Sequence, residues 1–427
     1  MKKYCELTTA EAKALYLELS EKYENYKSSG IKLDISRGKP NSDQLDIADG
    51  MLALSLPREK CINANGFDYR NYGLLDGISE AKKLFADLLG LNPDNIIVAG
   101  NSSLQLMYDS IARAMIFGNC DSEKPWAKEE GLKWICVTPG YDRHFKITED
   151  FGFELISVKM TPTGPDMDEV ERLALDPKVK GIWCVPKFSN PTGNTYSDET
   201  VRRLVSMKTG AKDFRIMWDN AYAVHAFAER DDKLLDVFAE AKKYGNENRV
   251  LFFASTSKIT LPGSGVAIIS ASEENLNDIK RRMGVQTIGY DKINQLRHVE
   301  YFGTADSIRE HMKKLGAAIK VKFDITLSAL ESLKGLGIAE WTEPYGGYFV
   351  SLDVVLGSAA RVFELMKGAG VTLTQVGATH PYGKDPEDKN LRIAPTYPTD
   401  SDLKLACDIL TLTVKMSALE TIIADRA

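Results

Sequence analysis

The sequence predicts an α/β fold, with a mostly parallel sheet in a large domain and a smaller α+β domain. Between about residues 96 and 270, short and nearly continuous apolar runs alternate with helical segments. This alternation is typical of parallel strands that are buried on both faces. After residue 300 the alternation stops and a long helix is expected. A chain of 427 residues is also long enough for two or three domain-sized units.

The individual elements follow from hydrophobic spacing. Helices are expected over residues 9–26 and 80–89, with a short strand and a turn within 33–40 and Gly90 as the C-cap of the second helix. The predicted strands of the large sheet are residues 96–99, 134–137, 155–158, 181–186, 214–218, 250–254 and 266–270, and a helix over 102–116 follows the first of them. A helix over about 306–333, a strand within 347–352 and a helix after residue 400 complete the chain.

Composition excludes several classes of protein. The formal net charge is -6 and no polybasic run occurs, so nucleic acid is not an expected partner. Six cysteines form no CxxC pair, and five histidines form no HExxH motif, so neither a disulfide framework nor a zinc site is predicted. No signal peptide and no stretch of 18 apolar residues is present, so we expect a cytoplasmic protein without a membrane partner.

Polar side chains follow the ends of several predicted strands, at the edge where open α/β sheets bind their ligands. They are Asn101, Ser102 and Ser103 after one strand, Tyr141 after the next, and then Asn190, Asp219 and Lys258 after three more. Each of them has a structural explanation as well as a functional one.

Lys258 follows an apolar strand and a serine-rich turn. In a dry site a lysine loses its charge, and the neutral amine can condense with an aldehyde; the alternative is a surface lysine at a turn.

Asp219 ends an apolar strand, where a carboxylate needs a partner. A protonated ring nitrogen at about 4 Å would stabilise it by about 4 kcal/mol at an effective dielectric near 20. A structural or metal-binding aspartate is the alternative.

Three further segments carry polar groups with two explanations each. The Asn-Pro-Thr-Gly segment at 190–193 is a turn, in which Asn190 could donate to a phenolate oxygen. The segment 101–103 opens a helix, either as an anion site or as a simple N-cap. Arg392 lies inside an apolar strand and needs an anion, either a bound carboxylate or an internal salt bridge.

Taken together, the order of these motifs resembles that of a known family. Asn-Pro-x-Gly, Asp-x-x-Tyr, Ser-x-Ser-Lys and a late arginine occur in the order found in fold type I aminotransferases of class I, which depend on pyridoxal 5'-phosphate. The resemblance covers nearly the whole chain. The blocks at 36–40, 100–104 and 139–144 look most like the subgroup called Ic aspartate aminotransferases.

The resemblance implies roles around the cofactor ring. Lys258 would hold the cofactor as a Schiff base and then move the proton between the substrate Cα and cofactor C4'. Asp219 would pair with the ring nitrogen, with His144 supporting it from behind. The remaining ring contacts would come from Asn190 and Tyr222 at the 3'-oxygen and from Tyr141, which would stack on the ring.

The resemblance also implies where the phosphate and the substrate bind. The phosphate would lie among Asn101, Ser102, Ser103, Ser255 and Ser257, and Tyr72 would reach the phosphate of the partner subunit in a homodimer with shared active sites. Gly38 would let the backbone approach the substrate, and Arg392 would bind its α-carboxylate. The expected domains are an N-terminal segment, 1–60, that joins the small domain, a large cofactor-binding domain, 61–305, and a linking helix with the small C-terminal domain, 306–427.

One motif departs from the family pattern. The family usually has an arginine about eight residues after the lysine, as a clamp on the phosphate, whereas residues 259–266 contain none. Hydroxyls, amides and a distant cation would then hold the phosphate.

The expected function is transfer of an amino group from an L-amino acid, aspartate or glutamate by resemblance, to a 2-oxo acid such as 2-oxoglutarate or oxaloacetate. Arg143 is a candidate for the substrate's distal carboxylate; a surface salt bridge is its alternative explanation, and Arg37 competes for the role. The alternatives are an aromatic or kynurenine aminotransferase, a β-lyase, or a ligand-sensing regulator. A regulator is disfavoured because only about 30 residues precede the first predicted strand, without a basic helix-turn-helix.

Overall fold

An eight-stranded sheet forms the centre of the structure, a computed structural model that describes residues 2–227, 230 and 232–426. The strand order is β2-β9-β8-β7-β6-β3-β4-β5. The strands are β2 (Ile96–Val98), β3 (Lys133–Thr138), β4 (Glu154–Thr161), β5 (Gly164–Pro165), β6 (Val179–Cys184), β7 (Arg215–Asp219), β8 (Val250–Ser255) and β9 (Ala267–Ala271). Neighbours from β8 to β4 run parallel, while β9 is antiparallel to both β2 and β8, and β5 is antiparallel to β4. The predicted mostly parallel sheet is therefore confirmed.

Helices cover both faces of this sheet. They are α3 (Ser79–Leu89), α4 (Ser103–Phe117), α5 (Asp142–Asp150), α6 (Met167–Ala174), α7 (Asp198–Ser206), α8 (Val237–Lys242), α9 (Glu273–Gln286) and α10 (Lys292–Phe302). Along β7, Ile216 and Trp218 belong to a core shared with α6, α7 and α8, whereas Met217 belongs to a core shared with α4, α5 and α9. Because successive strand residues point to opposite faces, burial of both explains the continuous apolar runs in the sequence.

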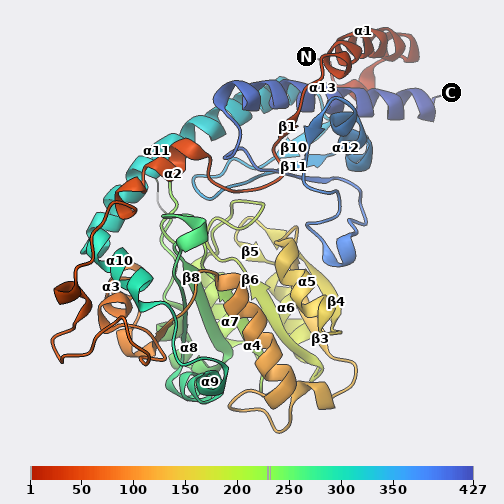
Figure 1. Cartoon of the computed structure of the whole chain (residues 1–427). Coiled ribbons are helices and arrows are strands. Elements are labelled where there is room, and N and C mark those ends of the chain that lie inside the picture. The colour runs from red at the N-terminus through yellow and green to blue at the C-terminus, as the bar shows by residue number, and fades with distance from the viewer. Residues whose placement is uncertain (1, 228–229, 231, 427) are drawn as a thin grey trace.

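A second group of elements contains two small sheets. β10 (Ala339–Trp341), β11 (Val350–Val354) and β13 (Asn390–Ile393) form an antiparallel sheet, and β1 (Leu33–Asp34) pairs in parallel with β12 (Val371–Thr372). The helices of this group are α1 (Thr9–Ser28), α2 (Ser42–Asp46), α12 (Ala359–Gly368) and α13 (Asp400–Asp425). In Figure 1, α1 and α13 lie side by side, joined by a 2.8 Å hydrogen bond from the Tyr16 hydroxyl to Glu420.

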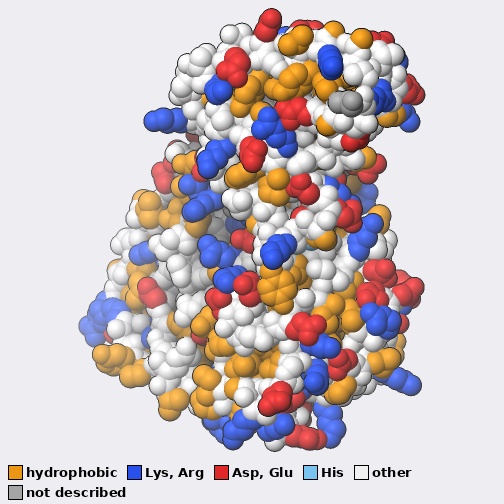
Figure 2. All heavy atoms as spheres, turned by 90° about the vertical axis from the view of Figure 1, so that its right-hand side faces the viewer, with side chains coloured by type: hydrophobic (Ala, Val, Ile, Leu, Met, Phe, Trp, Pro, Cys, Tyr) orange, Lys and Arg blue, Asp and Glu red, His pale blue; other side chains and the backbone are white. Residues whose placement is uncertain are grey.

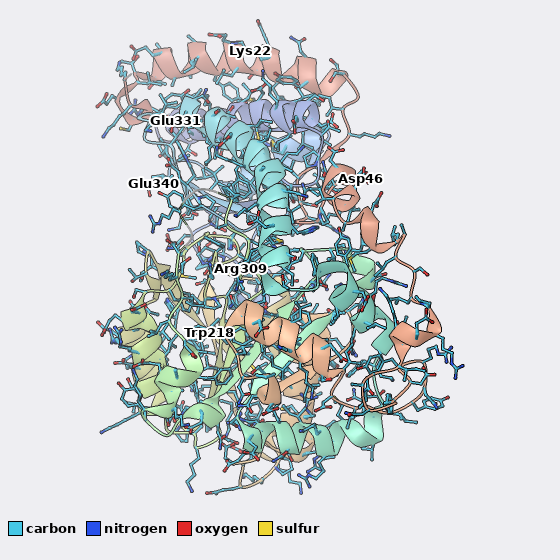
Figure 3. The ribbon with its side chains drawn as sticks, turned by 90° about the vertical axis from the view of Figure 1, so that its left-hand side faces the viewer. Lys22, Asp46, Trp218, Arg309, Glu331 and Glu340 are labelled. Carbon is cyan, nitrogen blue, oxygen red and sulfur yellow. The ribbon has the colours of Figure 1, made fainter. Side chains whose placement is uncertain are left out.

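One long helix, α11 (Ala305–Leu330), joins the two groups of elements. It begins beside the large sheet, where Arg309 donates to backbone carbonyls at the end of α3, and reaches Glu331 next to the small sheets (Figure 3). The helix that the sequence predicts over about 306–333 is α11 together with the short 3-10 turn Glu331–Leu333. Gly90 ends α3 in the left-handed conformation with φ of 71°, as predicted for its C-cap.

The surface mixes charges of both signs, as the face in Figure 2 shows. Among the residues that the structure describes, none of the helices combines the length and the apolar character needed to cross a membrane.

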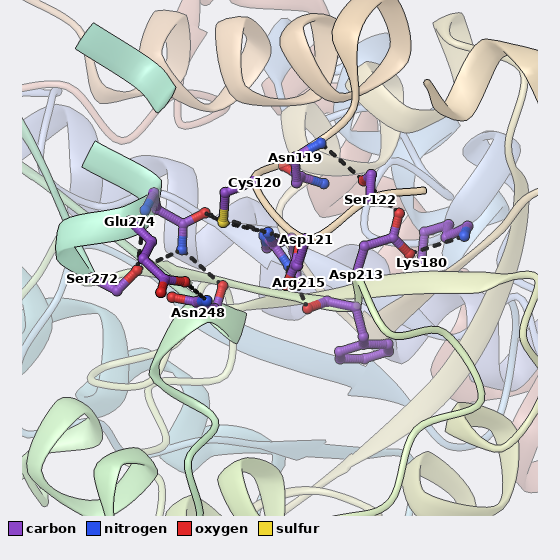
Figure 4. A network of polar contacts seen from close by, with 12 residues as sticks. Asn119, Cys120, Asp121, Ser122, Lys180, Asp213, Arg215, Asn248, Ser272 and Glu274 are labelled. Carbon is purple, nitrogen blue, oxygen red and sulfur yellow. Dashed lines mark hydrogen bonds and ion pairs between the residues drawn. The ribbon is translucent and has the colours of Figure 1, made fainter. Parts of the chain in front are cut away.

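A network of buried polar groups closes the amino-terminal edge of the large sheet (Figure 4). Arg215, the first residue of β7, is fully buried and donates two hydrogen bonds to Asp121, at 2.5 and 3.1 Å. Beside it, the buried Lys180 bonds Asp213 at 3.0 Å, and Asp213 accepts from the Trp126 indole at 2.6 Å. These pairs tie the loop after α4 to the starts of β6 and β7.

Removing the partner of Arg215 should destabilise the fold. Asp121→Asn leaves a buried guanidinium without its counter-charge, so we expect a loss of about 3 kcal/mol in the free energy of unfolding. Denaturant unfolding of the purified variant would measure it. Glu123→Gln is the control, because Glu123 lies in the same loop and pairs with Lys212 in an exposed contact. This substitution should lower the free energy of unfolding by less than about 1 kcal/mol. Equal stability of both variants would contradict the structural role of the network.

Candidate active site

A cavity of about 690 Å³ opens at the carboxyl-terminal edge of the large sheet, between this sheet and the smaller ones. Twelve of the residues predicted for the site line it: Gly38, Ser102, Ser103, Tyr141, Arg143, Asn190, Asp219, Tyr222, Ser255, Ser257, Lys258 and Arg392. They come from segments up to 354 residues apart in the sequence, since Gly38 and Arg392 face the same space. The ends of parallel strands meet at one edge, which explains the convergence.

Asp219 ends β7 with its carboxylate buried in the wall of this cavity. One oxygen, Oδ2, lies 3.0 Å from Nε2 of His144, while Oδ1 is buried without a hydrogen-bond partner among the described residues. The His144 ring stacks on Trp183 with 4.5 Å between centroids, so its orientation is fixed. His144 therefore lies behind Asp219, outside the cavity lining, and leaves Oδ1 available to a donor in the cavity.

Lys258 follows β8 and points its amine toward two aromatic rings. Its Nζ lies 5.1 Å from the ring centroid of Tyr222 and 5.9 Å from that of Tyr348. Burial lowers the pKa of Lys258 below its ordinary value, and the charge of Asp219 opposes this shift. Its backbone carbonyl is held by Nε2 of His225 at 3.0 Å. Because the charged form is disfavoured, the neutral and nucleophilic amine is easier to reach at neutral pH.

Three other polar side chains surround the space between Asp219 and Lys258. Tyr222 is buried, and burial raises the pKa of its phenol well above the ordinary value. Tyr141 precedes α5, and burial together with the charges of Asp142 and Asp219 raises its pKa to about 12. Both tyrosines therefore stay protonated and can donate at neutral pH. Asn190 is buried after β6, with its Oδ1 at 3.5 Å from Nη1 of Arg392.

Serines and free amides meet at the start of α4. Ser102 is at the N-cap position but makes no side-chain capping bond, so the first amides of a 15-residue helix lack a side-chain cap. This disfavours the reading of the segment as a simple cap and fits an anion site. The hydroxyl of Ser257 bonds the carbonyl of Asn101 and accepts from Ser255, both at 3.1 Å. Asn101 thus contributes its backbone rather than a cavity-lining side chain.

No arginine follows Lys258 in the turn at 259–266. A Cβ at Gly265 would lie at ordinary contact distance from the backbone around it, 3.4 Å from the carbonyl of Asn101 and 3.5 Å from the amide of Ser257. Apart from Lys258, the cavity residues contributed by α4 and by the turn after β8 are uncharged.

Arg392 enters the cavity from β13, in the small antiparallel sheet. Its guanidinium is buried over the ring of Phe349, 5.1 Å from the centroid. Nη1 forms an ion pair of 2.8 Å with Asp142, and Nε lies 3.4 Å from the hydroxyl of Thr374. The structure therefore contains the internal salt bridge that was the alternative explanation for this arginine, in a position that also faces the cavity.

Two more arginines, Arg37 and Arg143, line the same cavity. Both are exposed, and neither forms an ion pair with any residue that the structure describes. The alternative explanation of Arg143 as part of a surface salt bridge therefore has no support within the described residues.

Tyr72 is the predicted site residue that lies away from the others. It is 78% exposed and does not line the cavity of its own chain. Its predicted contact requires a second chain.

Sequence reasoning missed several residues around the cavity. Asp142, Phe349, Tyr348 and His225 all contact predicted site residues. The available signals were weak: Asp142 directly follows Tyr141, and the aromatic pair follows two glycines at 346 and 347. Phe349 explains in part why residue 38 is a glycine, since a Cβ at this position would lie 2.4 Å from its ring.

The residues present fit pyridoxal phosphate as a ligand. The unpartnered Oδ1 of Asp219 suits a protonated ring nitrogen, and the uncapped start of α4 with the serines after β8 suits a phosphate. A lysine with a lowered pKa faces the same cavity. This combination can bind an aldehyde covalently while holding its anionic and cationic ends.

Comparison with known proteins gives a consistent result. Residues 7–426 match the family model described as "Aspartate amino-transferase". An aspartate aminotransferase from Corynebacterium glutamicum is 48% identical over 404 residues, which is 94% of this chain and 93% of that protein.

Solved structures extend the similarity to three dimensions. A crystal structure of an aspartate transaminase from C. glutamicum has a TM-score of 0.95 at 46% identity and covers 98% of this chain and 99% of that one. An α-aminoadipate aminotransferase from Thermus thermophilus, solved with N-(5'-phosphopyridoxyl)-L-leucine, shares the fold at 20% identity with a TM-score of 0.73, covering 94% and 95% of the two chains.

Proposed function

The chain belongs to the aspartate aminotransferase family, and from this premise we propose that it transfers the amino group of L-aspartate or L-glutamate to 2-oxoglutarate or oxaloacetate. It is an aminotransferase of fold type I that depends on pyridoxal phosphate. The choice of acidic substrates rests on one observation, the three arginines Arg37, Arg143 and Arg392 that line a single cavity. A substrate with two carboxylates needs two cations in a mostly desolvated pocket.

The cofactor supplies an electrophilic aldehyde and a ring that accepts electrons from the substrate. Lys258 would hold the aldehyde carbon through its amine. Once released, the same amine would move the proton between the substrate Cα and cofactor C4', since burial lowers its pKa and so favours the neutral form that a base requires. The burial and aromatic surroundings of the amine support both roles.

The other residues bind and orient. Asp219 would keep the ring nitrogen protonated through Oδ1, with His144 fixing the carboxylate from the other side. Asn190 and Tyr222 would donate to the ring's 3'-oxygen, and Tyr141 would pack on the ring. The α4 amides and the hydroxyls of Ser102, Ser103, Ser255 and Ser257 would hold the phosphate without an arginine.

Arg392 would bind the α-carboxylate of the substrate, and Arg143 its distal carboxylate. Arg392 is suited to this because it is buried, planar and supported by Phe349. Arg143 is suited because it directly follows the start of α5 at the rim of the cavity and has no ion-pair partner among the described residues. Arg37 is the other cation at this rim.

We also propose a cytoplasmic homodimer in which Tyr72 reaches the partner's phosphate. Tyr72, Val285 and Ile288 are 78%, 91% and 63% exposed. They belong to one surface, because the backbone at Gly289 packs so closely on Gly73 that a Cβ would lie 2.7 Å from its carbonyl oxygen. Large exposed apolar side chains that cluster mark a protein interface. Six unpaired cysteines suit a reducing compartment.

The domain division proposed for the chain has its boundaries near residues 60 and 305. It is supported by the eight-stranded sheet within 96–271 and by the small sheets, which combine β1 from the N-terminal segment with strands after residue 338.

Lys258→Ala should abolish transamination and covalent attachment of pyridoxal phosphate, because no other lysine lines the cavity among the described residues. Borohydride reduction of the wild-type holoenzyme, followed by peptide mapping, should label Lys258. Lys322→Ala is the matched control, since Lys322 is a buried lysine bonded to the carbonyl of Pro398 and its loss should leave the label in place. A label on a different lysine in the wild type would refute the assignment.

Asp219→Asn should leave a folded protein that still binds the cofactor but turns over at least ~100-fold more slowly, since a loss of roughly 2.7 kcal/mol of preorganised electrostatics has that effect. The substitution keeps the size of the side chain and removes only its charge. The rate constant for the half-reaction with glutamate would measure the effect, and the absorbance of bound cofactor would verify occupancy. Turnover close to that of the wild type would rule out the pairing with the ring nitrogen.

Arg143→Leu should weaken aspartate and glutamate selectively. The fall in kcat/KM for these two donors should correspond to a free energy of roughly 1.5–3 kcal/mol, the range for a hydrogen bond to a charged group. The value of kcat/KM for alanine should change little. A panel of amino donors with 2-oxoglutarate measures this and also tests the proposed substrates. Lys146→Leu serves as the control, because Lys146 is an exposed cation of the same helix that pairs with Asp150. If Arg143→Leu lowers kcat/KM equally for all donors while Arg37→Leu lowers it only for aspartate and glutamate, Arg37 binds the distal carboxylate.

A further inference from the structure

Asp142 forms an ion pair with Arg392, the residue that is proposed to bind the α-carboxylate of the substrate. Its Oδ1 lies 2.8 Å from Nη1 of Arg392. We propose that Asp142 is a resident carboxylate, which neutralises Arg392 between substrates and must leave Nη1 when a substrate carboxylate binds. Asp142 would then set the affinity of the enzyme for carboxylates. The inference rests on the proposed role of Arg392.

The contacts of Arg392 show why a resident anion is needed. Its side chain is 8% exposed, and a buried guanidinium without a counter-charge is strongly unfavourable. Its remaining polar contacts are neutral and long, 3.4 Å to Thr374 and 3.5 Å to Asn190. Among the residues that the structure describes, no carboxylate other than that of Asp142 pairs with it. Asp142 therefore provides the charge that lets Arg392 face the cavity before substrate arrives.

The geometry of the pair makes the exchange a competition. A carboxylate that binds an arginine in the bidentate mode uses two N–H groups of the planar fork. Asp142 holds Nη1, whereas Nη2 makes no hydrogen bond with any described residue. A substrate carboxylate that takes both nitrogens must therefore displace Asp142. One carboxylate replaces another, and Arg392 is paired before and after the exchange.

The position of Asp142 in its helix allows it to leave. It is the first residue of α5, where the helix dipole and the free amides stabilise a negative charge. Its side chain is 33% exposed, so solvent can also hydrate the released carboxylate. The displaced anion thus has two sources of stabilisation other than Arg392.

Asp142→Asn tests the competition, because asparagine keeps the shape and removes the charge. Calorimetric titration of the holoenzyme with succinate, a dicarboxylate without an amino group, should give a dissociation constant roughly 5- to 20-fold lower than in the wild type. Asp198→Asn is the matched control. Asp198 is likewise the first residue of its helix and pairs with an arginine, Arg202, but on the surface, so its loss should leave succinate binding unchanged.

The sign of the change distinguishes the possibilities. Weaker binding in Asp142→Asn would mean that Asp142 only holds Arg392 in position, and an unchanged constant would mean that it does not compete; either result overturns the proposal. Arg392→Leu is tested in parallel. If this variant binds succinate as tightly as the wild type, the assignment of Arg392 itself fails, which is a separate failure.

A measurement on the wild type keeps the proposal testable if Asp142→Asn does not fold. In a crystal structure of the holoenzyme with succinate on Arg392, Asp142 should have left Nη1. A structure in which Asp142 still bonds Nη1 while succinate binds the same guanidinium would overturn the proposal.

Discussion

A charge that is buried away from water must be compensated by an opposite charge or by hydrogen bonds, and this constraint organises both edges of the large sheet. At the amino-terminal edge each of the two buried cations is paired with an opposite charge, Arg215 with Asp121 and Lys180 with Asp213. At the carboxyl-terminal edge the compensation is partial. Within the described part of the chain, one oxygen of Asp219 has a hydrogen-bond partner and the other has none, and burial lowers the pKa of Lys258.

The edge with incomplete compensation is the one that carries the cavity. Oδ1 of Asp219 and the uncapped amides of α4 are groups that a folded protein normally satisfies internally. Here they face one cavity, and each matches a different part of one cofactor: a cationic ring nitrogen and an anionic phosphate. We therefore propose that these features, which would be defects in a structural core, are the binding groups of the site, and that the cofactor would complete the compensation that the chain leaves open.

Much of this arrangement could be predicted from the sequence, because local signals report it. Strands buried on both faces leave apolar runs, so β7 and β8 were expected within two residues of their observed bounds, and Asp219 and Lys258 follow at their ends. Contacts between distant segments leave no local signal. A buried Arg392 implied an anionic partner, but Asp142 is 250 residues away and no spacing rule connects the two. Tyr72 is exposed, and the contact predicted for it would likewise involve a second chain rather than neighbours in the sequence.

The pairing of Arg392 with Asp142 also joins the two groups of elements, since β13 lies in the small antiparallel sheet and α5 packs on the large one. If this ion pair were the main connection, its opening would separate the walls of the cavity. Two hydrogen bonds between neutral groups span the same boundary, from the amide of Gly140 to the carbonyl of Thr379 and from the amide of Leu155 to the hydroxyl of Tyr382, both at 2.8 Å. These bonds do not depend on the charge of Arg392. The walls can therefore stay in contact while one carboxylate replaces another, so the exchange changes the occupant of the guanidinium without requiring the cavity to be rebuilt.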